Sequence, residues 1–263
     1  MGTRHTRRAL LAVLVLTASG ALAPGGSAEG RSSAPAPRKA TAVPDLHLSE
    51  TAAPACFAGS GAAIHLQPGS SRSRVVTLGS GPRGVVLAPI SWGNACEWAA
   101  EAKRLAAAGY HVASVDWGTD RQRTVLHATR LLRARGADRV AWVGGCVGGN
   151  VMLGLAPRTS AAERPVGVAG ISPLASLGGY ASSVPAPYDG RLFLLGTADD
   201  PLADARRLRE VAASFPSAEV VVLPGTLHAA EIFAGPHADR ARKELDTFLE
   251  ASFAHATSSD PGA

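Results

Sequence analysis

A short glycine-rich turn around one cysteine is the feature of this sequence that most restricts its fold. Residues 140–150 read Val-Ala-Trp-Val-Gly-Gly-Cys-Val-Gly-Gly-Asn, an apolar run that leads into glycines. The spacing Gly-x-Cys-x-Gly, from Gly144 to Gly148, is that of a nucleophile elbow with sulfur in place of the usual serine oxygen. Such an elbow needs residues without a Cβ on both sides of the nucleophile, because strand and helix approach closely there. The turn therefore predicts a buried strand, a sharp bend at Cys146, and a helix whose N-terminus faces the sulfur.

The first residues of the chain have the pattern of an export signal peptide. Residues 1–28 place Arg4, Arg7 and Arg8 ahead of an apolar run at residues 9–16, and they end in small residues. The two adjacent arginines fit a twin-arginine signal and an ordinary secretory signal equally well. The apolar run is too short to cross a bilayer. We therefore expect a secreted protein with no stable membrane span.

Composition also marks the limits of the folded domain. Residues 29–55 are rich in Ala, Pro and Ser and have little periodicity, which is typical of a flexible linker. Residues 255–263 have the character of a flexible tail. The segment between them, residues 56–254, has a usual length for one domain with one hydrophobic core.

Strand and helix patterns alternate along this domain. Residues 62–66 and 74–78 are expected to form an antiparallel pair at the edge of a sheet. The strands that follow alternate with helices over short connections, which implies right-handed crossovers and a mostly parallel sheet. The sequence therefore predicts a doubly wound α/β fold with helices on both faces. The remaining strands are expected at residues 84–90, 111–115, 139–143, 166–171, 192–195 and 219–223, and the helices between Asn94 and Gly109 and at residues 121–135, 147–155, 201–214 and 238–253.

The charge of the chain gives no indication of a nucleic-acid partner. The formal net charge is +5, and Arg4, Arg7 and Arg8 contribute three of these charges, which leaves +2 for the rest. The other positive residues are scattered through the linker or along the helix expected at residues 121–135, where they fit a solvated surface. The sequence has no zinc-type spacing of Cys and His and no phosphate-binding loop, so neither a metal nor another cofactor is expected.

Cysteine number points to one free thiol. Three cysteines in an exported chain leave at least one without an intramolecular partner. Cys56 precedes the first expected strand and Cys96 begins a helix, so both could lie near the surface and form a disulfide. Cys146 would then be the free thiol. A buried cysteine can also be only a small hydrophobic residue, so its role depends on the side chains that the fold brings to it.

Two later strand ends supply a carboxylate and a histidine. Asp199 follows the strand at residues 192–195, and His228 follows the strand at residues 219–223. A nucleophile at the carboxyl end of a strand needs a general base and a group that orients this base, so Cys146, Asp199 and His228 form the expected set. Asp199 is preferred because it comes first after its strand, but it could instead cap the next helix. The other candidates are Asp200 and Asp204 for the acid and His237 for the base.

The order nucleophile, acid, histidine resembles that of the α/β-hydrolase fold, and the resemblance covers residues 62–253. Within that fold, the Gly-x-Cys-x-Gly-Gly form of the elbow at residues 144–149 is similar to that of dienelactone hydrolase and its relatives. The resemblance implies that Cys146 attacks an acyl carbon, that His228 takes or relays the thiol proton, and that Asp199 orients the imidazole.

The resemblance also implies an oxyanion hole made by the backbone N–H of Val147 and by that of Ile90 or Ser91. Many relatives carry His-Gly in the loop after the third strand, whereas this chain has Ala88-Pro89. Proline has no N–H to donate, so the hole depends on the residue that follows it. Beside Ser91, Trp92 would form a wall of the substrate pocket, or it could pack beneath the helix.

These features together predict an exported, single-domain α/β-hydrolase. It would cleave a carboxylic ester, lactone or thioester, in a small or a polymeric substrate, through a cysteine acyl-enzyme. The irregular segment at residues 172–191 is too short for a large lid. Two alternatives stay open, namely an acyltransferase that uses the same triad and a catalytically silent, hydrolase-like binding protein.

Overall fold

The computed structural model describes residues 53–69, 73–175 and 188–258. The signal peptide expected at residues 1–28 and nearly all of the linker expected at residues 29–55 lie outside these ranges. The folded region begins with a short 3-10 helix, η1 (Ala55–Phe57). At the other end, the last helix runs to Ser258, so the first residues of the expected tail are helical.

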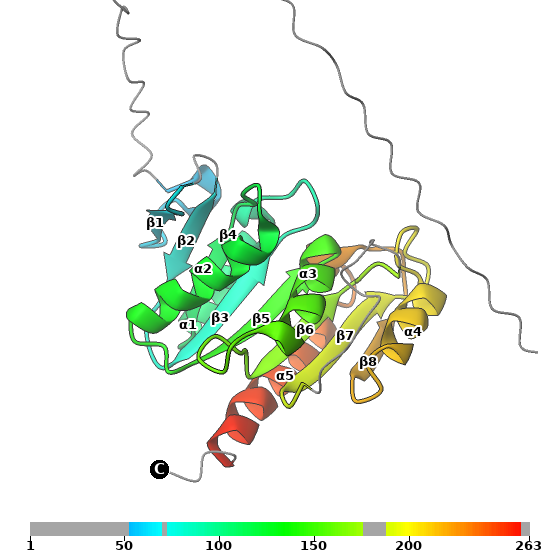
Figure 1. Cartoon of the computed structure of the whole chain (residues 1–263). Helices are drawn as coiled ribbons and strands as arrows, with labels where there is room; N and C mark the ends of the chain where they lie inside the picture. Colours follow the sequence, from blue (N-terminus) through cyan, green and yellow to red (C-terminus); the bar gives the residue numbers. More distant parts are fainter. Residues whose placement is uncertain (1–52, 70–72, 176–187, 259–263) are drawn as a thin grey trace, which may run out of the picture. The chain divides into compact units, whose positions relative to one another are not determined.

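One sheet organises the described part of the chain (Figure 1). Its eight strands have the order β1-β2-β4-β3-β5-β6-β7-β8. The pairs β1–β2 and β2–β4 are antiparallel, and all the other neighbours are parallel. The doubly wound, mostly parallel sheet predicted from the sequence is therefore confirmed, including its antiparallel edge. The strands are β1 (Ala63–Leu66), β2 (Arg74–Leu78), β3 (Arg83–Ala88), β4 (His111–Val115), β5 (Arg139–Gly145), β6 (Gly167–Ile171), β7 (Arg191–Thr197) and β8 (Glu219–Leu223).

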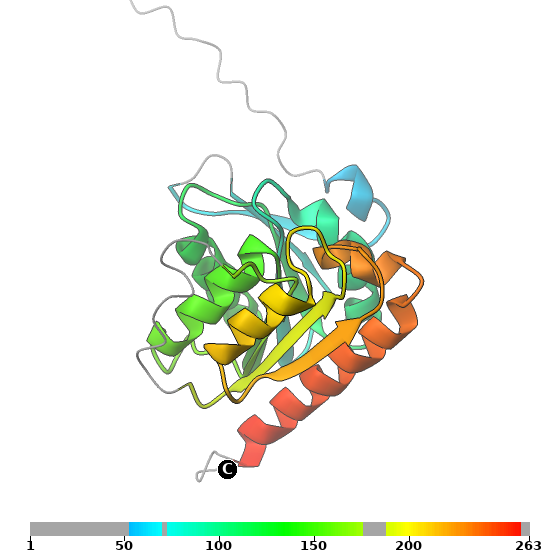
Figure 2. The same ribbon diagram turned by 90° about the vertical axis from the view of Figure 1, so that its right-hand side faces the viewer.

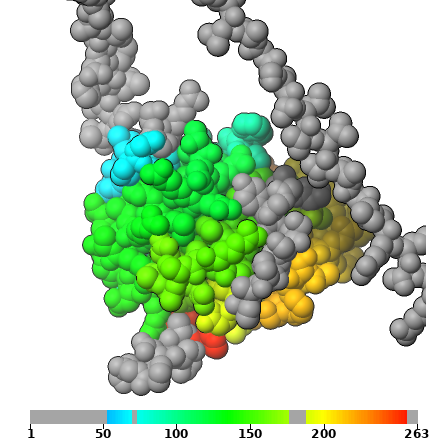
Figure 3. Space-filling view, in the orientation of Figure 1, coloured from blue at the N-terminus to red at the C-terminus, as the bar shows by residue number. Residues whose placement is uncertain are grey.

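Helices cover both faces of the sheet. On one face, α2, α3 and α4 pack on a core that includes Val140 and Trp142. On the other, α1 and α5 pack on a core that includes Ala141 and Val143. Figure 2 shows the sheet between these two layers, and Figure 3 shows α2 and α3 covering much of the first face. The helices are α1 (Ala99–Ala107), α2 (Arg121–Ala134), α3 (Val147–Leu155), α4 (Ala205–Ala213) and α5 (Ala238–Ser258), and the 3-10 helices after η1 are η2 (Ala95–Trp98), η3 (Ala156–Arg158) and η4 (Ala229–Ala234).

The alternation of the two cores along β5 follows from strand geometry. Successive side chains of a strand point to opposite faces, and a strand buried on both faces can be apolar throughout. The one polar atom of Trp142 is satisfied, because its Nε1 donates to Thr129 Oγ1 at 2.9 Å. Since β5 lies in the middle of the sheet, its carboxyl end is held in place by strands on both sides.

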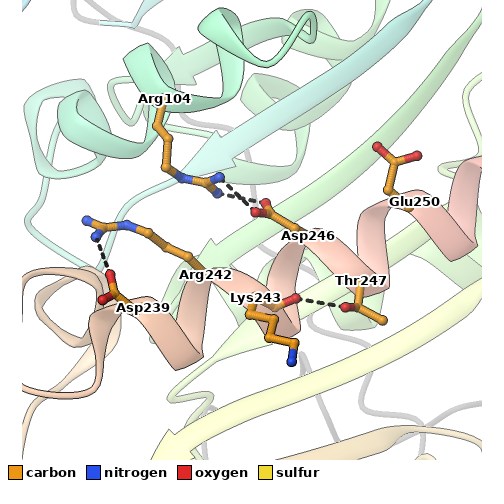
Figure 4. A pocket seen from close by; sticks show the side chains of 7 residues that line it. All are labelled: Arg104, Asp239, Arg242, Lys243, Asp246, Thr247 and Glu250. Carbon is orange, nitrogen blue, oxygen red and sulfur yellow. Dashed lines mark hydrogen bonds and ion pairs between the residues drawn. The ribbon is translucent and has the colours of Figure 1, made fainter.

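A charged network fastens α5 to α1 (Figure 4). Both terminal nitrogens of Arg104 donate to the carboxylate of Asp246 at 2.9 Å. Glu101, which is only 3% exposed, accepts from Arg104 and from Arg242. Arg242 also pairs with Asp239. The buried charge of Glu101 is therefore balanced by two guanidinium groups, which is the condition under which a buried carboxylate is tolerated.

The chain also has a covalent link near its folded start. Cys56 in η1 and Cys96 in η2 form a disulfide, with their Cα atoms 5.6 Å apart. The link closes a span of 40 residues that contains β1, β2 and β3. Within the described ranges, no helix combines the length and the apolar character needed to cross a membrane.

Candidate active site

Cys146 stands at the bend between β5 and α3. Its backbone has φ 50° and ψ −117°, in the region that residues other than glycine seldom adopt. The backbone N–H of Cys146 donates to the carbonyl oxygen of Ile171, and its own carbonyl accepts from Asn150. A Cβ on Gly148 would lie 2.6 Å from the carbonyl oxygen of Ala88, which explains why glycine is needed two residues after the cysteine. The sharp turn expected from the sequence is present.

His228 lies after β8 and is fixed by a buried carboxylate. Its Nδ1 is 2.6 Å from Oδ2 of Asp200, whose side chain is fully buried. The other oxygen of Asp200 accepts from the backbone N–H groups of Leu202 at 2.8 Å and Ala203 at 3.1 Å. Burial alone would raise the pKa of Asp200, but the hydrogen bonds from His228 and the backbone outweigh it and lower that pKa. Asp200 is therefore an ionised group that sets the orientation of the imidazole.

The prediction that Asp199 orients the histidine is wrong, because the next residue, Asp200, makes this contact. Asp199 is exposed, and its backbone N–H donates to Gly225. The strand β7 runs to Thr197, two residues further than expected, and the turn after it exposes the first aspartate while it buries Asp200. The third candidate, Asp204, caps α4 by accepting from the N–H of Arg207 at 2.8 Å.

The second nitrogen of His228 is directed at the cysteine side of the site. Nε2 is buried, and among the described residues it has no hydrogen-bond partner. Burial disfavours the charged imidazole, but the hydrogen bond to Asp200 and the interaction with Cys146 together raise the pKa of His228 to about 10. The charged imidazole is therefore favoured next to the sulfur, which is 5% exposed. His237, the other candidate base, is half-buried at the start of α5 and has no contact of this kind in the described residues.

The oxyanion-hole donors expected from the sequence have different surroundings. Val147 is the first residue of α3, where a backbone N–H has no partner within the helix. The N–H of Ile90 is engaged by the carboxyl group of Glu97, with distances of 3.2 Å to Oε1 and 3.1 Å to Oε2. In contrast to that of Val147, the N–H of Ile90 is therefore already paired with a side chain, that of Glu97 in η2.

Glu97 was missed by the sequence reasoning, although the sequence carries a signal for it. Asn94 is the N-cap of η2 and Glu97 stands three residues later, the spacing of a capping box. In a capping box the glutamate reaches back to the N-cap, whereas here it reaches further, to Ile90. Burial raises the pKa of Glu97 to about 7, with Glu231 acting in the same direction, against the hydrogen bond from Ile90 and the attraction of His228.

Two side-chain hydrogen bonds fix the loop that carries Ile90. The carbonyl oxygen of Ile90 accepts from Trp117 Nε1 at 2.8 Å, and the carbonyl oxygen of Ser91 accepts from Arg121 at 3.2 Å. Trp92 is 93% exposed, so it neither packs beneath the helix nor forms a closed pocket wall as expected. It stands in solvent on the loop that presents the Ile90 N–H.

Positive φ angles cluster at this site. Among the described residues, three that are not glycine have a positive φ: Cys146 at 50°, Ser172 at 49° and Ala229 at 49°. Ser172 directly follows β6, and Ala229 directly follows His228. Such conformations persist only where the surrounding structure enforces them, and they concentrate at functional sites.

The fold of this chain is similar to that of several solved enzymes. No protein-family model and no curated protein matches the sequence. A dienelactone hydrolase-like promiscuous phosphotriesterase from metagenomic libraries is 20% identical, with a TM-score of 0.56 over 72% of this chain and 96% of that one. A thermophilic esterase of Thermogutta terrifontis is 12% identical, with a TM-score of 0.58 over 82% of this chain and 99% of that one. A soluble variant of monoglyceride lipase from Saccharomyces cerevisiae is also 12% identical, with a TM-score of 0.58 over 73% of this chain and 94% of that one.

These likenesses extend over almost the whole of the other chains and agree with the mostly parallel sheet and its helical layers in this chain. The chain has the α/β-hydrolase fold.

Proposed function

We propose that this protein hydrolyses a carboxylic ester, a lactone or a thioester through an acyl-enzyme on Cys146. The observation that carries the proposal is the contact between Asp200 and His228, which orients an imidazole close to Cys146. A cysteine at a strand-to-helix bend, with a histidine and a carboxylate from later strand ends, is the arrangement of nucleophilic acyl transfer. The esterases and the lipase among the structural neighbours give this reading support by analogy of fold.

The first half of the reaction forms the acyl-enzyme. The thiolate of Cys146 attacks the carbonyl carbon, and the carbonyl π electrons move to oxygen, where the Val147 N–H stabilises the charge. When the tetrahedral intermediate collapses, the bond to the leaving group breaks. The protonated Nε2 of His228 gives its proton to that group, which departs as an alcohol or a thiol, or stays attached in a lactone.

The second half returns the enzyme to its starting state. Neutral His228 removes a proton from water, and the resulting hydroxide attacks the thioester carbon on Cys146. Collapse of this second intermediate releases the carboxylic acid and restores the thiolate beside a protonated imidazole. Asp200 keeps Nδ1 protonated throughout, so Nε2 is always the nitrogen that exchanges the proton.

A mass measurement with an activated ester such as 4-nitrophenyl acetate tests the proposal. We expect wild type to release nitrophenol repeatedly and to carry a transient acetyl group on Cys146. The variant Cys146→Ala should do neither, and His228→Ala should be severely impaired while His237→Ala keeps the wild-type rate. If wild type neither turns over nor becomes acylated, the enzymatic proposal is overturned and a binding role takes its place. If acetyl passes to an added alcohol or amine in preference to water, the protein is an acyltransferase.

We also infer that residues 1–28 direct export. The inference is supported by the basic start and apolar run of this segment and by the Cys56–Cys96 disulfide, since such bonds form in oxidising compartments. A reporter fused to residues 1–28 should appear outside the cytoplasm. Replacement of Arg7 and Arg8 by lysine should stop this export if the route is the twin-arginine one and should leave it intact if the route is the general secretory one.

A further inference from the structure

We propose that Glu97 completes the oxyanion hole as a neutral carboxylic acid, which donates a hydrogen bond to the oxyanion alongside the N–H of Ile90. The inference rests on the proposed acyl-enzyme function of Cys146. It gives this chain a third donor at the place where the Ala88-Pro89 sequence offers none.

The position of the carboxyl group is the first support. Both of its oxygens lie within 3.2 Å of the Ile90 nitrogen, the donor that faces the reacting carbonyl oxygen in this fold. Its Oε1 is also 3.3 Å from the place where a Cβ on Gly145 would stand, one residue before Cys146. The carboxyl group therefore contacts the Ile90 loop and also approaches the residue before Cys146, so it lies between that loop and the elbow.

The anchoring of η2 is the second support. Cys96, directly before Glu97, is held by the disulfide to Cys56, and its N–H donates to the N-cap Asn94 at 2.9 Å. Trp98, directly after it, is 1% exposed and donates from Nε1 to the carbonyl oxygen of Ala88 at 2.9 Å. With both neighbours fixed, the backbone of Glu97 stays beside the Ile90 loop, and its carboxyl group can move only by rotation of its own side chain. A small rotation of this kind lets the carboxyl group and the Ile90 N–H face the same oxyanion.

The charge of the Glu97 carboxyl group decides whether it can stabilise an oxyanion. An ionised carboxylate beside an oxyanion would repel it and would hold the Ile90 N–H as a competing acceptor, whereas the neutral acid presents an O–H donor and accepts more weakly. The titratable groups that act on Glu97 are His228, whose positive charge favours the carboxylate, and Glu231, whose negative charge favours the acid. Burial adds to the second effect, and with a pKa of about 7 the acid form is accessible at neutral pH. A carboxyl group kept neutral by its surroundings is an established way to donate to an oxyanion.

Two substitutions of Glu97 test whether its carboxyl group acts as a hydrogen-bond donor, acts as a base, or only blocks the oxyanion hole. Glu97→Gln keeps the shape and offers an N–H donor at every pH, while Glu97→Leu keeps bulk without any donor. We expect wild-type kcat/KM for the activated ester to fall as the pH rises through about 7, because the donor ionises. Glu97→Gln should stay within a few-fold of wild type at pH 6 and should lose this fall. Glu97→Leu should be reduced by about 10²-fold to 10³-fold across the range, the usual effect of removing one oxyanion-hole donor.

Two further variants serve as controls. Glu231→Gln removes a neighbouring negative charge and should move the fall in kcat/KM to lower pH. Glu210→Gln, in α4, removes an acid that pairs with Arg206 and should leave the profile unchanged. Each variant should retain its disulfide and its cooperative unfolding, so that lost activity is not lost folding.

Three results would overturn the role proposed for Glu97. Equal losses in Glu97→Gln and Glu97→Leu would show that the carboxylate acts as a base, because glutamine cannot accept a proton from the thiol. Higher activity in both variants would show that Glu97 only obstructs the hole. A wild-type kcat/KM that does not fall between pH 6 and 8 would also refute it. Absence of acylation at Cys146 in wild type, by contrast, would refute the acyl-enzyme function itself.

Discussion

The hydroxyl oxygen of Ser172 accepts a hydrogen bond from the backbone N–H of Ala229 at 3.1 Å. Ser172 is fully buried at the end of β6, and its own N–H donates to Leu195 of β7 at 2.7 Å. Ala229 is the residue after His228. The bond therefore ties the turn that carries the histidine to the ends of β6 and β7, and Ser172 is a positioning residue for His228.

Replacement of Ser172 by alanine should impair catalysis more than folding. The Ala229 N–H would be left buried without its acceptor, at a cost of about 1–3 kcal/mol in the free energy of unfolding. The turn would relax, and displacement of His228 by a fraction of an ångström should lower kcat/KM by about 10-fold to 100-fold. The His228 pKa, followed by NMR, should also shift, which loss of stability alone would not cause.

Ser252→Ala is the matched control for this prediction. Ser252 is equally buried and donates to the Phe248 carbonyl oxygen within α5. This variant should lose stability but keep the activity and the His228 pKa of wild type. Equal effects of the two substitutions on activity would mean that Ser172 has no positioning role.

Asparagine at positions 199 and 200 should have very different effects. Asp200→Asn removes the charge that holds Nδ1 of His228 protonated, so the pKa of His228 should fall from about 10 and kcat should drop by about 10²-fold to 10⁴-fold. Asp199→Asn changes an exposed side chain and should leave both quantities at the wild-type level. NMR titration of the imidazole and steady-state kinetics measure the two effects. Loss of activity in Asp199→Asn alone would reverse the assignment.

Loss of the disulfide should destabilise the domain without removing its fold. The bond joins residues that are 40 apart in sequence, and the chain-entropy relation gives about 4 kcal/mol for a loop of this length. The double variant Cys56→Ser, Cys96→Ser should therefore unfold at a markedly lower urea concentration than wild type. A change of less than about 1 kcal/mol in the free energy of unfolding would mean that the bond adds little constraint.

Three histidines near the antiparallel edge should make stability sensitive to mild acid. Burial lowers the pKa values of His65, His111 and His127 below the usual 6.5, and positive Arg135 adds to this for the first two. As the pH falls below 6.5, the unfolded chain takes up protons that the folded chain does not yet bind. These histidines therefore stabilise the fold above pH 6.5, and this contribution is lost as the pH falls towards their folded pKa values.

A single histidine substitution separates the effect of these histidines on the pH dependence of stability from the effects of Glu97 and His228. Glu97, with its raised pKa, acts in the opposite sense between pH 7 and 4.5, and His228 changes its contribution only above pH 6.5. We expect His127→Gln to reduce the loss of urea resistance between pH 7 and 5, whereas His237→Gln should leave that loss unchanged. Identical pH dependence in His127→Gln and wild type would contradict the prediction.

The fold and the elbow were predictable because their signals are local. An apolar run such as β5 can only be buried on both faces, and the glycines around Cys146 fit only a close approach of strand and helix. The order of strands and helices then leaves few topologies. The end of β3 was predicted too late, at residue 90, because the apolar character of Pro89 and Ile90 continues beyond the last ladder hydrogen bond.

The details of the site depend on side-chain directions that no local pattern fixes. Asp199 and Asp200 are identical in type and adjacent, so only the path of the turn after β7 decides which one meets His228. Glu97 reaches Ile90 across a turn, and Ser172 meets Ala229 across 57 residues. Such contacts follow from the tertiary arrangement, and the sequence offered only the capping-box spacing as a hint for one of them.

The disulfide also defines how the sulfur of this protein must be handled. The chain has three cysteines, so the bond between Cys56 and Cys96 leaves Cys146 as its one thiol. The molecule thus keeps two sulfurs oxidised and a third reduced, and the third, being 5% exposed, has no second thiol within the chain with which to react. A strong reductant, the usual protection for a cysteine enzyme, would here cut the link next to Glu97. Assays of this protein should therefore exclude oxidants by removing oxygen and peroxide, and not by adding thiols.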